Sequence, residues 1–217
     1  MNAGVADAFP SLDIDHLKVR IKKCKDEITI LKIWMPYVNE GNIDIKLLLD
    51  SIIKNGCRYR IIICDPAMEE PLNRRAIASG IYDLNSYKAA IEKNIIYFQQ
   101  LWTELKKRGH EDKIQLRLNT GFLSTSLMGF DDYYIFGLYL NNRFANLGMQ
   151  YKIIKNTEEG SLFYQELKEH FEFQWDNAGK EIRFSPSGYT IVIRQPIEVE
   201  TNAKQSDNSN SLPNDKI

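Results

Sequence analysis

The chain has few of the side chains from which most catalytic and metal sites are built. It contains three cysteines and three histidines among 217 residues. Few cysteines, odd in number and without a Cys-x-x-Cys pair, argue against a disulfide framework or a zinc site and favour a reducing, cytoplasmic location. With so little imidazole, a histidine-dependent nucleophile or metal site has little to draw on.

Long apolar runs and an excess of one charge are also missing. No stretch approaches the roughly 20 apolar residues of a membrane helix, and the first ten residues carry no secretory signal. The 28 basic residues are balanced by 29 acidic ones, so net charge does not support binding to nucleic acid or to a membrane surface, and such binding would have to be local. Phosphate-loop and dinucleotide motifs do not occur, and we expect neither a cofactor nor a metal.

What is present is an alternation of apolar strands and amphipathic helices. Apolar periodicity predicts helices over residues 14–27, 45–54, 86–108 and 161–179. Strand patterns cover residues 28–35, 58–64, 113–119, 133–140 and 149–155, and a terminal hairpin follows over 181–193. The first two strands and the helix between them indicate a βαβ unit, and the strands 133–140 and 149–155 an antiparallel pair.

These elements predict one α/β domain over residues 1–195. We expect a mostly parallel mixed sheet with helices on both faces and a small C-terminal hairpin. The segment "DPAMEEPLNRR", residues 65–75, reads as a polar loop between the second strand and the longest helix. Residues 196–217 have too little apolar content to be buried and are predicted to be a disordered polar tail.

Candidate binding residues follow the predicted strands, because open α/β sheets bind ligands at the carboxyl ends of their strands. Asp65 closes the strand 58–64 and suits a turn cap as well as a ligand contact. Arg75 can bind a phosphate with its fork of donors or pair with a surface carboxylate. Arg117, on the strand 113–119, should either meet a carboxylate such as Asp131 or Asp65 or line a polar pocket.

The stretch "FLSTSLMGFDDYYIFGLYL", residues 122–140, places two serines and two aspartates ahead of an aromatic strand. It supplies no histidine or lysine, so Asp131 and Asp132 suit an architectural role, one accepting hydrogen bonds and the other facing water. The aromatic strand 133–140 either fills the core of the monomer or forms a contact surface between two copies.

Several segments together resemble bacterial domains related to the phospholipase D superfamily: "KIWMPY", "GCRYRIIICDP", "NRRA", "IQLRLN", "FDDYYIFG" and "HFEFQWDNA". The superfamily carries a His-x-Lys-x4-Asp motif. Aligned on its aspartate, Asp131, the chain has Ser124 at the histidine position and Ser126 at the lysine position. The resemblance therefore implies a degenerate phospholipase D-like domain that lacks the catalytic His-x-Lys pair.

A serine without a nearby base replaces neither the imidazole nucleophile nor the cation of that mechanism. The resemblance thus implies a non-catalytic, ligand-sensing or dimerising module of a bacterial regulatory or defence system, acting as a homodimer. Its expected partner is a phosphate-bearing ligand or a protein, and its expected ligand-binding residues are Asp65, Arg75, Arg117, Ser124, Ser126 and Asp131. The alternative is a phosphodiesterase or nuclease with a relocated catalytic group, for which His170 is the candidate nucleophile. A module that binds anionic lipid is a third possibility.

Overall fold

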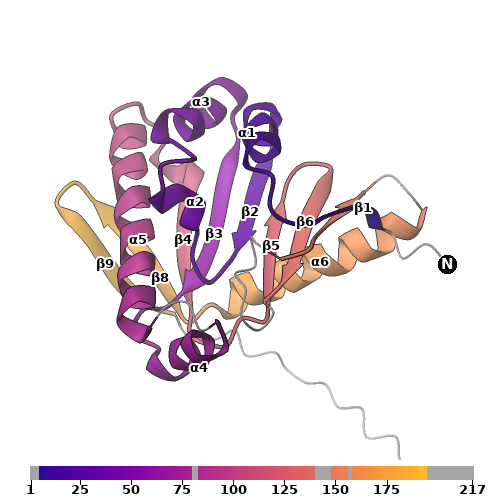
Figure 1. Cartoon of the computed structure of the whole chain (residues 1–217). Coiled ribbons are helices and arrows are strands. Elements are labelled where there is room, and N and C mark those ends of the chain that lie inside the picture. The colour runs from indigo at the N-terminus through magenta and orange to yellow at the C-terminus, as the bar shows by residue number, and fades with distance from the viewer. Residues whose placement is uncertain (1–4, 80–82, 140–147, 156–157, 195–217) are drawn as a thin grey trace, which may run out of the picture.

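The computed structural model describes residues 5–79, 83–139, 148–155 and 158–194, which contain nine strands in one sheet (Figure 1). The strands are β1 (Val5–Phe9), β2 (Glu27–Leu31), β3 (Arg58–Cys64), β4 (Ile114–Asn119), β5 (Thr125–Gly129), β6 (Tyr133–Leu138), β7 (Gln150–Ile154), β8 (Lys180–Ser185) and β9 (Gly188–Ile193). The helices are α1 (Ile14–Lys23), α2 (Pro36–Asn39), α3 (Ile45–Asn55), α4 (Glu69–Ser79), α5 (Leu84–Lys106), η1 (Glu111–Lys113) and α6 (Glu158–Asn177).

The sheet is mixed and mostly antiparallel. Its strand order is β1-β7-β6-β5-β2-β3-β4-β8-β9, in which only β2–β3 and β3–β4 are parallel pairs. The predicted mostly parallel sheet is therefore wrong. The error arose because β1 and β5 were not recognised as strands, and because strands joined by short turns, such as β5 and β6, must run antiparallel.

The helices cover the two faces unequally. Helices α1 to α5 contact one another in a connected layer, whereas α6 packs against β4, β5, β6 and β7. Strand β3 separates the two sides: Tyr59 hydrogen-bonds Ser51 of α3 at 2.7 Å, while the next residue, Arg60, binds Glu172 of α6 at 2.6 Å. Five helices against one is not the two-sided arrangement expected of a phospholipase D-like fold, and that prediction is also wrong.

Local signals account for the elements that were predicted correctly. Strands β2 and β3 are parallel with α3 between them, as the βαβ pattern predicts, and both β6–β7 and β8–β9 are antiparallel pairs. Helix α3 ends at Gly56, whose φ of 78° lies in the left-handed region that glycine adopts readily. The predicted polar loop over 65–75 is wrong, because α4 begins at Glu69.

Strand β6 lies inside the sheet, between β5 and β7. Tyr133 and Tyr134 on it are almost fully buried; Tyr133 stacks on Phe130, and Tyr134 contacts the tilted ring of Tyr164 of α6. These two rings of the aromatic strand therefore fill the core of the monomer, whereas Phe136 and Tyr139 are partly exposed, and a contact surface between copies stays a prediction.

The described helices include none with the length and apolar character that a membrane span needs. The polar tail predicted over residues 196–217 lies outside the described residues, and the single domain over residues 1–195 stays a prediction.

Candidate functional site at the carboxyl ends of the parallel strands

Buried polar side chains gather at one edge of the sheet. Strands β2, β3 and β4 end there, the antiparallel strands β5, β7 and β8 begin there, and α4 lies beside it at the bottom of Figure 1. We call this the carboxyl edge. Nine polar or charged side chains are buried among the described residues, and seven belong to this edge: Lys32, Asp65, Arg75, Asn94, Asn119, Ser126 and Gln150. Burial of polar groups is unfavourable, so their concentration makes this edge the candidate site.

Lys32 and Ser126 form the innermost pair of this edge. Lys32 Nζ donates to Ser126 Oγ at 2.7 Å, and the two side chains are 2% and 1% exposed. The ammonium also lies 5.7 Å from the ring centroid of Tyr37. Within the described residues no carboxylate forms an ion pair with Lys32, and burial lowers the pKa of its amine to about 7. A cation is thus held here without a balancing anion.

A row of polar side chains continues from this pair across the sheet. The register places Ser126 opposite Gly137 of β6, and Gly137 opposite Gln150 of β7. A Cβ at Gly137 would lie 2.7 Å from Gln150 Nε2, so a larger residue would displace the buried amide. The glycine of the aromatic strand is therefore required by this row rather than by a turn.

Asp65 and Lys180 provide the ion pair of the carboxyl edge. Asp65 is fully buried, and its Oδ2 lies 2.5 Å from Lys180 Nζ at the start of β8 without the alignment of a hydrogen bond. Its other oxygen, Oδ1, accepts from the Ala67 N–H at 3.0 Å, so Asp65 also caps the turn after β3. The turn cap expected of Asp65 is therefore confirmed, whereas its contact with a ligand stays a prediction.

Arg75 and Ser124 reach the same edge through Tyr139. The guanidinium of Arg75, which is 3% exposed, lies 4.8 Å from the ring centroid of Tyr139. The Tyr139 hydroxyl accepts from the Ile33 N–H just beyond β2, at 2.9 Å, and the Tyr139 N–H donates to the Ser124 carbonyl at 3.0 Å. The structure thus brings Asp65, Arg75, Ser124 and Ser126 to one edge.

Arg117 lies away from that group. It stacks on Trp175 of α6, 3.9 Å from the ring centroid, and donates to the Trp175 carbonyl at 2.6 Å. Burial, and next the charge of Arg194, lower the pKa of Arg117 to about 10. Among the described residues it forms no ion pair with Asp131 or Asp65, and its side chain contributes to the lining of a pocket between β4 and β8.

Asp131 lies at the opposite end of β2 and serves as architecture. It accepts from the backbone N–H groups of Lys25, Asp26 and Glu27 at 2.8 to 3.2 Å and from Cys24 Sγ at 3.1 Å. Burial opposes ionisation, but these donors outweigh it and lower the pKa of the carboxyl. Asp131 is therefore separated by the length of β2 from Asp65, and the structure does not bring it to the predicted binding group.

Other catalytic groups have no counterpart at the carboxyl edge. His170 is exposed on α6, and no cluster of three metal-ligating side chains occurs among the described residues. The three cysteines are buried free thiols, with Cys57 Sγ 3.2 Å from Cys24 Sγ.

Lys32 and Lys180 were missed by sequence reasoning. Lys32 lies within the apolar run "ITILKIWM" and reads as one polar residue in a strand, while its partner Ser126 is 94 residues further along the chain. An amine therefore lies beside Ser126, the residue at the lysine position of the motif, and not beside Ser124 at the histidine position. A lysine among β-branched residues was the one available signal, because such a side chain is rarely buried without a reason.

Comparison with known proteins adds little to this geometry. No protein-family model and no curated protein matches the chain. Among solved structures, the chain is similar to TrmBL2, an archaeal chromatin protein that shows a novel mode of DNA binding, with 19% sequence identity and a TM-score of 0.39. The match covers 78% of this chain and 51% of that one, so the chain spans about half the length of TrmBL2. A likeness of this strength carries no argument about function, and it does not bear on the phospholipase D resemblance.

Proposed function

We propose that the chain is a non-catalytic regulatory module that binds a phosphate-bearing ligand at the carboxyl edge. The observation that carries this proposal is the buried amine of Lys32, which is 2% exposed and forms no ion pair with a carboxylate within the described residues. Lys180, paired with Asp65, and Arg75 bring further positive charge to the same edge. A buried ammonium group is unfavourable in the absence of an anion.

A phosphate group satisfies these side chains better than a carboxylate does. Its charge approaches −2 near pH 7, and it offers three oxygens to several donors. Lys180 keeps 22% of its side chain exposed and is a first point of contact, whereas Lys32 and Ser126 are almost fully buried. Arginine and lysine differ in role here, because Arg75 can engage two oxygens and a lysine acts as a point charge.

The contact between Lys32 and Ser126 favours a second candidate, a phosphodiesterase whose nucleophile is Ser126. A neutral Lys32 amine can accept the hydroxyl proton, which is the role of the base in serine–lysine dyads. Burial limits both candidates alike, because Ser126 is 1% and Lys32 2% exposed, so a direct experiment has to separate them. His170, the nucleophile that the sequence suggested for this class, is exposed on α6 without a link to the carboxyl edge.

A fluorophosphonate probe separates the two candidates. If Ser126 is a nucleophile, a Ser126 Oγ–phosphorus bond forms, fluoride leaves and the proton passes to Lys32, so intact protein gains the mass of the phosphonyl group. If the chain is a binding module, the wild type and Ser126→Ala should behave alike, with no adduct at Ser126 in the wild type. An adduct at Ser126, confirmed by peptide mapping, would replace the proposal with the enzyme.

Ligand binding is tested by thermal denaturation with inorganic phosphate, pyrophosphate and ATP at fixed ionic strength. We expect at least one of these to raise the melting temperature of the wild type, because a ligand that binds only the native state stabilises it. Lys32→Met should abolish the rise, and Lys54→Met, on the exposed side of α3, should retain it. No rise with any of the three, or an equal rise in Lys32→Met, would contradict the proposal.

The homodimer, the cytoplasmic location and the link to bacterial regulation or defence remain parts of this proposal. Sedimentation velocity tests the first directly, since a dimer doubles the mass expected for a chain of 25.2 kDa. A module of this kind would transmit ligand binding through α4, which carries Arg75 beside the carboxyl edge.

A further inference from the structure

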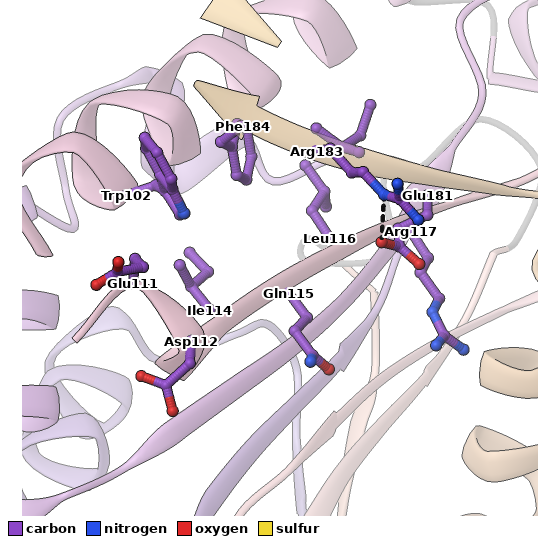
Figure 2. A pocket seen from close by; sticks show the side chains of 11 residues that line it. Trp102, Glu111, Asp112, Ile114, Gln115, Leu116, Arg117, Glu181, Arg183 and Phe184 are labelled. Carbon is purple, nitrogen blue, oxygen red and sulfur yellow. Dashed lines mark hydrogen bonds and ion pairs between the residues drawn. The ribbon is translucent and has the colours of Figure 1, made fainter. Parts of the chain in front are cut away.

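Strands β4 and β8 are paired over three residues each, and beyond them the strands diverge. The ladder joins Leu116–Leu118 of β4 to Lys180–Ile182 of β8. Among the described strands, Ile114 and Gln115 pair with β3 alone. A cavity of about 330 Å³ occupies the gap between the diverging strands (Figure 2). Its size is at the lower end of small-molecule sites.

One end of this cavity is aromatic. Trp102 of α5 and Phe184 of β8 lie side by side above Ile114 and Leu116 in Figure 2, with ring centroids 6.2 Å apart and ring planes at 38°. Both rings are partly exposed. A flat apolar group can therefore lie against them and remove their faces from water.

Negative charge lies beside the aromatic rings, on the same side of the cavity as Trp102 in Figure 2. Glu111 and Asp112 of η1 line it, and within the described residues neither forms an ion pair. Glu181 is already paired with Arg183 at 3.3 Å. The guanidinium of Arg117 extends away from the aromatic rings in Figure 2 and donates to a carbonyl of α6. The charge available to a ligand is thus that of Glu111 and Asp112.

The indole of Trp102 already attracts an ammonium group. Lys106 Nζ, one helical turn further along α5, lies 5.0 Å from the ring centroid. Cations favour the electron-rich faces of indole rings over those of other aromatic side chains. Aromatic faces with two carboxylates beside them, neither of which forms an ion pair within the described residues, are complementary to one kind of small molecule.

We propose that this cavity binds a small aromatic amine, with its ring against Trp102 and Phe184 and its ammonium group facing Glu111 and Asp112. The site is independent of the proposed phosphate site, because it lies at the start of β4 whereas Asn119 of the carboxyl edge lies at its end. The same sheet would then bind two ligands of opposite charge, an anionic phosphate at the carboxyl edge and a cationic amine in this cavity.

The test is a titration of the ¹⁵N-labelled full chain with 2-phenylethylamine, followed by the indole N–H resonance of Trp102. We expect a saturable shift of this resonance. The uncharged analogue 2-phenylethanol should bind at least about tenfold more weakly, which corresponds to about 1.4 kcal/mol. The double variant Glu111→Gln, Asp112→Asn should weaken amine binding by about tenfold or more.

Glu166→Gln, which removes an exposed carboxylate from α6, is the matched control and should leave the affinity unchanged. Phe184→Ala should also lower the affinity for the amine, although both carboxylates are unchanged in this variant. No saturable shift with the amine, equal binding of the alcohol, or unchanged affinity in the double variant would each overturn the proposal. Because no phosphate is present in the titration, its outcome does not depend on the carboxyl edge.

Discussion

Replacing Lys32 by methionine should make the protein more stable while it loses its ligand. The buried amine has a pKa of about 7, against an ordinary value of 10.5 that it regains on unfolding. This difference of about 3.5 pKa units amounts to about 5 kcal/mol at most, at about 1.4 kcal/mol per unit. Methionine has a similar shape and no charge, so the variant does not incur this free-energy cost of burying an amine.

Part of the gain is lost at Ser126. Its buried hydroxyl would lose the partner at 2.7 Å, which costs about 1 to 3 kcal/mol. We therefore expect Lys32→Met to raise the free energy of unfolding by about 2 to 4 kcal/mol at pH 7. Residues that lower the stability of a fold are typical of binding sites, where function requires a less stable arrangement.

The dependence on pH isolates Lys32 from all other groups. Because the native pKa lies below the unfolded one, the unfolded chain binds one proton more between about pH 7 and 10.5, and wild-type stability should rise with pH across this window. The stabilisation by Lys32→Met should therefore shrink by about 1.4 kcal/mol per pH unit above pH 7 and stay constant below it.

Urea denaturation of both proteins from pH 6 to pH 9.5 measures this difference. Lys54→Met, an exposed lysine paired with Asp50 on α3, should follow the wild type at every pH. Two results would refute the claim that Lys32 is buried without an ionic partner. One is a Lys32→Met variant that is less stable than the wild type at pH 7, and the other is a stability difference between the two proteins that does not change with pH.

Three further substitutions test other parts of the structure by urea denaturation. Asp131→Ala should destabilise by about 2 to 4 kcal/mol, because it strips three backbone N–H groups of their acceptor, whereas Asp132→Ala at the exposed neighbour should stay within about 0.5 kcal/mol; equal effects would contradict the architectural role. Gly137→Ala should cost about 1 to 3 kcal/mol through the clash with Gln150, and a neutral result would show that the amide is not packed there. Tyr139→Phe should cost about 1 to 2 kcal/mol by leaving a backbone N–H after β2 unpaired, and no loss would place water at that group.

Local elements could be predicted from the sequence because their signals are local. The βαβ unit follows from apolar runs and from the glycine stop at Gly56, and the terminal hairpin follows from "SPSG" between alternating segments. Strand β5 could not be recognised this way. Its residues "TSLMG" are small or polar at both ends, and its strand character comes from pairing with β2 and β6.

The site was predicted in part for a similar reason. Asp65 and Arg75 follow a recognisable strand, so the rule of carboxyl ends locates them without any tertiary information. Lys32, by contrast, becomes informative only once Ser126 is known to face it across β2 and β5. Arg117 was assigned to the binding group because its strand could be recognised from the sequence. The face of the sheet on which its side chain lies could not, since that depends on its contact with α6.

The most direct test of the central claim is the calorimetric affinity for pyrophosphate at pH 6 and pH 8.5. Lys32 is mostly charged at the lower pH and mostly neutral at the higher one, while pyrophosphate itself gains negative charge as the pH rises. The account predicts that the wild type binds about tenfold or more weakly at pH 8.5 and that Lys32→Met binds weakly at both. Equal affinity of the wild type at the two pH values, or unchanged binding in Lys32→Met, would contradict a phosphate site built on this buried cation.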